Sequence, residues 1–176
     1  RLYKFISYNR KVIVARKCGH GVYDCSPAYN LFYRLLFMGW FFIFNSAMLY
    51  PLHEHLFTRF IFYELSFLQL QTAHLLFVAV NCSIAIILGG RKGIEYLGQV
   101  NMLATITILL LSIFMLLNIV LPLAEWLIVF YLGGVTLLIL KEYFRRMKYS
   151  GVFPLYKNVI ALNLCSLVMF LIYVFH

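Results

Sequence analysis

Polar side chains interrupt the apolar stretch at residues 67–89, and one of them is an imidazole. His74 is the only Asp, Glu, Lys, Arg or His well inside any long apolar stretch of the chain. At about 100° per residue, a helix gathers four polar residues on one side: Gln71, His74, Asn81 and Cys82. Polar groups in a membrane helix face protein or a water-filled cavity rather than lipid. The pattern therefore predicts a polar interior face on this segment.

Two interpretations of that face remain open. A neutral imidazole binds metals or a haem-type cofactor and relays protons, so His74 is a candidate cofactor ligand; the cofactor itself stays unidentified. The alternative is that amides and imidazole only join helices through hydrogen bonds, which average about 0.6 kcal/mol in membranes. Asn101, Thr105 and Ser112 share a face of a later apolar stretch and are expected to meet this one.

A second set of candidate ligands flanks the apolar stretches. His53 and His55 follow the first stretch, Glu64 precedes the second and Glu125 begins the fourth. Imidazole with carboxylate suits zinc or a similar ion. If the helices alternate in direction, short connections bring these residues to one surface, so we predict an outward-opening depression that they border with His74. The alternatives are a solvated polar rim and, for Glu125, a carboxylate at a helix N-terminus, where the helix dipole favours it.

The segment at residues 18–25 contains Cys18, His20 and Cys25. Zinc sites are typically built from C-x2-4-C and H-x3-5-H pairs, and this spacing matches neither. A loop with incidental cysteines is the default interpretation. The chain also lacks Walker, dinucleotide-binding, HExxH and paired CxxC signatures.

Composition places these residues in a membrane protein. Hydrophobic residues make up 64% of the 176-residue chain and charged residues 12%, whereas soluble domains have about 45–50% and about 25%. Each crossing of the hydrocarbon core needs ~20 apolar residues. A chain of this length therefore holds several crossings but no separate soluble catalytic domain.

We predict an all-α bundle with about five transmembrane helices. Their expected ranges are 31–52, 67–89, 97–120, 124–140 and 158–175. Residues 1–30 form a basic cytoplasmic N-terminal segment that precedes a transmembrane domain at 31–176. Residues 53–66 are expected to be interfacial or to extend the helix ends. Residues 91–96 and 141–157 are expected to be basic connections, and the Gly133–Gly134 pair should allow close helix approach.

The positions of Lys and Arg predict the orientation. With the N-terminus inside, the inner segments hold seven in residues 1–34, two in 91–96 and five in 141–157, while the outer segments hold only Arg59. Positive residues are retained on the cytoplasmic side. This alternation predicts five crossings, an inner N-terminus and an outer C-terminus, in a multi-pass protein of a cytoplasmic or inner type of membrane.

The same charges suggest partners. Arg145, Arg146 and Lys148 lie among aromatic residues and are candidates for contact with anionic headgroups on the cytoplasmic side. A cytoplasmic connection is basic in any case, so this pattern has an ordinary explanation too. The net charge of +9 follows from these connections and does not indicate a nucleic-acid partner. Association with other membrane subunits, or with itself, is consistent with the pattern.

Three functional classes remain. The first is a non-enzymatic membrane subunit or a small transporter-like protein with an inward polar face. The second is a membrane redox component that binds a metal or haem-type cofactor through His74. The third, a membrane enzyme acting on lipids, requires a converging acid–base pair near the headgroups, for which Glu54, His55 and Glu125 are the candidates.

Overall fold

All regular secondary structure in the part of the chain that the structure describes is helical. The structure, a computed structural model, describes residues 2–15, 29–57, 65–121 and 123–175. These residues form α1 (Leu2–Val14), α2 (Leu31–Leu52), α3 (Phe67–Leu88), α4 (Gly90–Val120), α5 (Glu125–Tyr149) and α6 (Lys157–Phe175). A short π-helical turn, η1 (His53–Phe57), continues α2. The predicted all-α class is confirmed.

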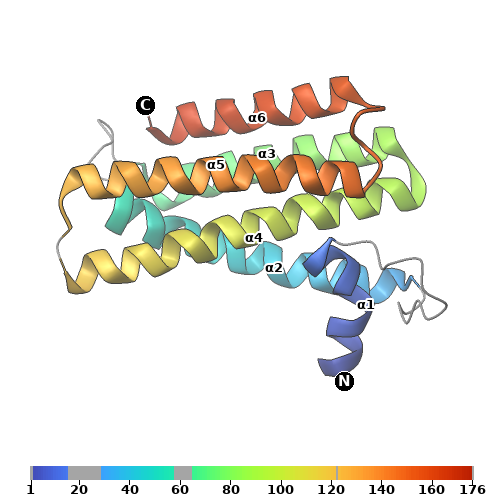
Figure 1. Ribbon diagram of the computed structural model, residues 1–176, viewed down its shortest axis with the longest axis horizontal. Coiled ribbons are helices and arrows are strands. Elements are labelled where there is room, and N and C mark those ends of the chain that lie inside the picture. Colours follow the sequence, from blue (N-terminus) through green and yellow to red (C-terminus); the bar gives the residue numbers. More distant parts are fainter. Residues whose placement is uncertain (1, 16–28, 58–64, 122, 176) are drawn as a thin grey trace.

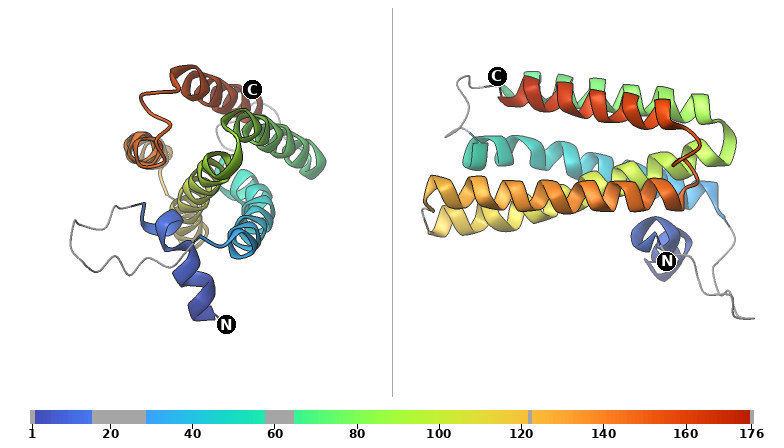
Figure 2. Two further views of the ribbon diagram at one scale, coloured as in Figure 1. Left: turned by 90° about the vertical axis from the view of Figure 1, so that its right-hand side faces the viewer. Right: turned by 45° about the horizontal axis from the view of Figure 1, so that its top comes forward.

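Four helices are long and apolar enough to cross a membrane. They are α2 with η1, α3, α4 and α5, and α6 adds a shorter apolar helix at Lys157–Tyr173. In Figure 1 these helices run back and forth along one long axis, and each is antiparallel to the next. Helix α4 contacts α2, α3 and α5, whereas α6 packs on α3. Helix α1 lies across the end of the bundle rather than along it (Figure 2).

One end of the bundle gathers the positive charge. At this end, here called the basic end, α2, α4 and α6 begin and α3 and α5 finish (Figure 1). All eleven Lys and Arg of the described residues belong to α1 or to the third of a helix nearest this end. At the opposite end η1 lies beside the connection from α4 to α5. Asn118 fastens it there: the side chain donates to the carbonyl oxygen of His55 (3.1 Å) and accepts from the amide of Leu123 (3.2 Å).

Local sequence explains where helices begin. Asn30 caps α2 by accepting a hydrogen bond from the Tyr33 amide at 3.2 Å. Ser66 and Gln69 form a capping box at the start of α3, in which each side chain bonds to the other's backbone amide. Both arrangements satisfy amide groups that have no partner inside the helix.

The predicted connection at 91–96 and the first part of the one at 141–157 are helical instead, which corrects the predicted boundaries. Residues 91–96 form the first turns of α4, and α5 continues through the basic residues to Tyr149. The apolar length of a segment reports the thickness of the hydrocarbon core and not the length of the helix, so charged turns extend beyond it. Only the glycine pair leaves the helical path between α3 and α4, with φ of +70° at Gly89 and +43° at Gly90, values that glycine adopts without strain.

The distribution of polarity is reversed relative to a soluble bundle. Large apolar side chains lie outside: Ile86 is 79% exposed and Phe130 is 80% exposed. Carboxamides and guanidinium groups are buried instead, among them those of Asn45, Asn81, Gln99, Asn118 and Asn163, with Arg34 and Arg146. Lipid accepts apolar surface but offers no hydrogen bonds, so polar groups are satisfied inside the bundle.

Candidate functional site

The polar face of α3 contacts the neighbouring helices through Asn81, His74 and Gln71. Nearest the basic end, the Oδ1 atom of Asn81 accepts from the Tyr96 hydroxyl of α4 at 2.8 Å and from the Nδ2 atom of Asn163 of α6. The Nδ2 group of Asn81 donates to the carbonyl oxygen of Phe77 at 2.9 Å. Asn81 therefore joins three helices through one buried side chain.

His74 lies further along the same face and contacts α2. Its Nδ1 atom is hydrogen-bonded to the Ser46 hydroxyl at 3.0 Å, and its ring stacks on Phe42 with centroids 5.3 Å apart. Gln71 donates to the backbone carbonyl of Ser46 at 2.8 Å. These contacts fix the orientation of the imidazole through Nδ1, so Nε2 is the nitrogen that remains for a ligand.

A third polar group connects α2 to α4. The Nδ2 group of Asn45 donates to Oδ1 of Asn101, and the Thr105 hydroxyl donates to Oδ1 of Asn45, both at 3.2 Å. Asn101 also donates to the carbonyl oxygen of Met38 at 3.0 Å. Asn45 was not among the residues predicted from the sequence. Its signal is a carboxamide in the middle of an apolar stretch, where a polar group requires a protein partner.

These polar groups converge on a pocket between α2, α3 and α4, here called the intramembrane pocket. Its volume is about 300 Å³ and its walls are mainly apolar. The polar residues of its lining are Asn45, His74, Asn81, Cys82 and Asn101. Leu35, Gly39 and Cys82 are also exposed on the surface of the bundle. An apolar cavity with a few convergent polar groups is the usual form of a small-molecule site.

The candidate metal ligands His53, His55 and Glu125 lie at the end of the bundle opposite the basic end. His53 is buried in the first position of η1, His55 is exposed two residues later, and Glu125 is exposed at the start of α5. Among the described residues, no group of three or more His, Cys, Asp and Glu side chains is arranged to hold a metal ion. Glu64 and the set Cys18, His20 and Cys25 lie outside the described residues.

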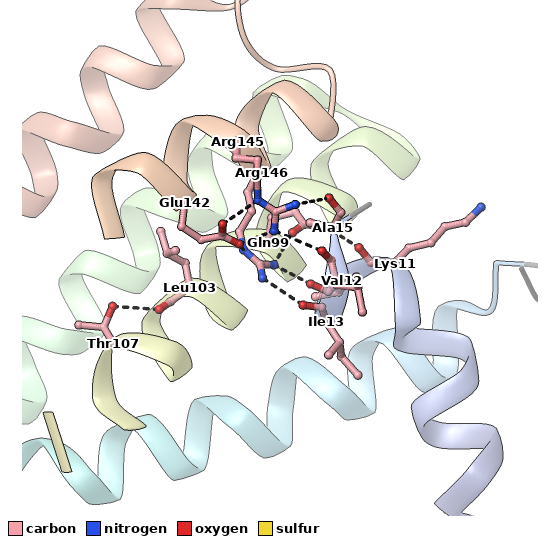
Figure 3. Close-up of polar contacts among 11 residues, drawn as sticks. Lys11, Val12, Ile13, Ala15, Gln99, Leu103, Thr107, Glu142, Arg145 and Arg146 are labelled. Carbon is pink, nitrogen blue, oxygen red and sulfur yellow. Dashed lines mark hydrogen bonds and ion pairs between the residues drawn. The ribbon is translucent and has the colours of Figure 1, made fainter. Parts of the chain in front are cut away.

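The arginine pair of α5 is engaged within the protein (Figure 3). The Nη1 group of Arg146 donates to the carbonyl oxygen of Val12 at 2.6 Å and to Oε1 of Gln99 at 2.7 Å. Its Nη2 group donates to the carbonyl oxygen of Ile13 at 3.0 Å, and its Nε group to Glu142 at 2.8 Å. The Arg146 side chain is only 2% exposed, and it donates four hydrogen bonds to groups of the protein.

Arg145 continues this arrangement at the end of α1. Its Nη1 group donates to the carbonyl oxygen of Ala15 at 2.8 Å and its Nη2 group to that of Val14 at 3.2 Å. Glu142 pairs with both arginines. The last carbonyls of a helix lack internal partners and carry negative partial charge, so the two guanidinium groups cap α1 and attach it to the bundle. Of the predicted headgroup contacts, Arg145 and Lys148 remain exposed.

No protein-family model, curated protein or solved structure matches the chain.

Proposed function

We propose that this chain is a small transporter-like protein or a binding subunit of a membrane complex. In this proposal it holds a small molecule with an apolar body and one hydrogen-bonding group in the intramembrane pocket. The observation that carries the proposal is the convergence of His74, Asn45 and Asn101 on a largely apolar cavity of about 300 Å³. That volume lies at the lower limit of ligand pockets, roughly 300–1,000 Å³, so it suits a small ligand.

We infer five crossings with the basic end in the cytoplasm. The gathering of eleven Lys and Arg at one end of the described bundle supports this orientation. The fifth crossing is α6, whose apolar part at Lys157–Tyr173 has a length of about 26 Å at 1.5 Å per residue. A hydrocarbon core of ~30 Å is spanned by such a helix once polar side chains at its ends reach the interface.

The second candidate function is a redox component with a metal or haem-type cofactor on His74. The hydrogen bond between Nδ1 and Ser46 favours it, because ligating histidines are oriented by a hydrogen bond at the other ring nitrogen. A stoichiometric metal or a visible absorption band in the purified protein supports this function. A colourless, metal-free protein supports the binding function.

We predict that filling the intramembrane pocket removes its ligand. Ala104 lines the pocket, and in Ala104→Phe the added ring occupies space that the ligand needs. A steric cost of about 1–3 kcal/mol, as for overpacking, corresponds to a loss of affinity of roughly 5- to 150-fold. Solvent extracts of the purified protein and of the variant are compared by mass spectrometry.

The matched control is Ala79→Phe, since Ala79 is an exposed residue of α3 that does not line the pocket. Wild type and Ala79→Phe should retain the same small molecule in stoichiometric amount. If no molecule distinguishes Ala104→Phe from the other two proteins, the proposed binding function is wrong.

A further inference from the structure

A second cavity opens at the basic end, where α1, the start of α4 and the end of α5 meet. Its volume is about 470 Å³. Six residues line it, and three of them are cations: Lys11, Arg91, Lys92, Glu95, Tyr149 and Ser150. This basic pocket shares no lining residue with the intramembrane pocket.

Aromatic rings, rather than carboxylates, hold two of these cations in place. The guanidinium of Arg91 lies 4.7 Å from the centroid of the Tyr29 ring, and Nζ of Lys92 lies 4.7 Å from that of Tyr156. Across residues 2–15, 29–57, 65–121 and 123–175, no ion pair involves Lys11, Arg91 or Lys92. A cation–π contact orders the side chain and leaves its positive charge uncompensated.

The single carboxylate of the basic pocket has another cation beside it. Oε1 of Glu95 lies 3.5 Å from Nη2 of Arg34, whose side chain is only 2% exposed. The Nε and Nη1 atoms of that guanidinium are buried without a hydrogen-bond partner, so Glu95 is the carboxylate that balances the charge of Arg34, which also lies 5.9 Å from the centroid of the Tyr29 ring. The three cations of the lining therefore give the pocket a net positive charge.

Hydrogen bonds within the protein hold the walls of the basic pocket in place. The carbonyl oxygen of Lys11 accepts a hydrogen bond from Gln99 at 3.2 Å, and the two arginines of α5 hold the residues that follow. Arg91 and Lys92 belong to the first turn of α4, whose N-cap, Gly89, makes no side-chain hydrogen bond. The positive end of the α4 dipole adds to the charge of the side chains.

We propose that the basic pocket binds the phosphate group of an anionic phospholipid. Three cations on a preorganised concave surface fit a compact anion with several acceptor oxygens. A lipid is favoured over a soluble phosphate because α1, which forms one wall, exposes the apolar residues Leu2, Tyr3 and Ile6 beside its basic residues. That combination is typical of a helix at the membrane interface. The inference rests on the membrane placement proposed above and not on the intramembrane pocket.

The test measures binding of phosphatidylglycerol to the full chain by native mass spectrometry, with phosphatidylcholine as the uncharged comparison. Wild type should bind one phosphatidylglycerol molecule in preference to phosphatidylcholine. Arg91→Gln/Lys92→Gln should weaken this binding by about tenfold or more, because it removes two of the three cations and their charge-assisted hydrogen bonds to the phosphate group. The control Lys141→Gln/Lys157→Gln removes the same charge from exposed positions outside the pocket and should change binding less than about twofold.

Three outcomes overturn the proposal: no preference for phosphatidylglycerol, equal weakening in both double variants, or displacement of the lipid by glycerol 3-phosphate at equal concentration. The last outcome would assign the pocket to a soluble phosphate compound. If Arg91→Gln/Lys92→Gln does not fold, the single variant Lys11→Gln on α1 removes one cation of the same pocket. This variant should also weaken the binding of phosphatidylglycerol. None of these lipid-binding measurements depends on whether a ligand occupies the intramembrane pocket. The lipid proposal and the proposed binding function can therefore fail independently.

Discussion

Gly93→Ala is expected to lower the free energy of unfolding by about 3 kcal/mol or more, the upper range for overpacking. A Cβ atom at Gly93 would lie 2.1 Å from the carbonyl oxygen of Ala85 and 2.9 Å from its carbonyl carbon. Both atoms belong to the backbone of α3, so relief requires the α3–α4 hairpin to separate. Equilibrium unfolding in mixed micelles with increasing denaturing detergent measures the difference.

The control is Gly133→Ala in the interior of α5. No atom lies within 4 Å of a Cβ built at Gly133, and alanine has the higher helix propensity by about 0.8–1 kcal/mol. This variant should be as stable as wild type or slightly more stable. Equal stability of Gly93→Ala and Gly133→Ala would show that the close approach of α3 to α4 is incorrect.

Arg146→Met is expected to detach α1 and to destabilise the protein by about 3 kcal/mol, the lower value for breaking a buried charged network. Methionine retains much of the side-chain length. It leaves three acceptors without their donor: the carbonyl oxygens of Val12 and Ile13 and the side-chain Oε1 atom of Gln99. Helix α1 has 13 residues, and helices shorter than ~12–15 residues are marginal on their own. Amide hydrogen exchange should therefore accelerate along α1 and change little in the apolar part of α4.

Two further variants show whether the loss of protection in α1 is caused by the hydrogen bonds of the Arg146 guanidinium. Lys148→Met removes one exposed charge two residues away and should leave exchange in α1 unchanged. Arg146→Lys keeps the charge but cannot reach Val12, Ile13, Gln99 and Glu142 at once, so it should resemble Arg146→Met. If α1 remains protected in Arg146→Met, the network does not hold this helix.

Local patterns were sufficient for the helical class and for several helix starts. Apolar stretches of sufficient length predicted the long helices, and the Ser66–Gln69 spacing is that of a capping box. The start of α4 and the end of α5 were not predicted, since charged residues that flank an apolar stretch do not end a helix. Gly133 and Gly134 were expected at a close approach, but the crowded glycines are Gly93 and, less tightly, Gly98, which sequence alone did not distinguish.

Contacts between segments far apart along the chain could not be predicted from the sequence. Arg146 was assigned to lipid because it lies in a basic, aromatic segment, yet its partner Val12 is 134 residues away. A cation near the end of a membrane helix meets a headgroup or a neighbouring carbonyl with similar chemistry, and only the packing decides between them. Asn45 was missed for a related reason: its partners Asn101 and Thr105 lie on α4, and one amide alone does not identify them.

The central claim is a five-crossing protein whose basic end faces the cytoplasm. Sided labelling of single cysteines at positions 148, 125 and 173, each exposed and each introduced after replacement of the four native cysteines, tests it most directly. An impermeant maleimide should reach position 148 only from the cytoplasmic side, and positions 125 and 173 only from the opposite side. Labelling of position 148 from outside would show that the orientation is opposite to the proposed one. Labelling of position 173 from the same side as position 148 would show that α6 does not cross the membrane.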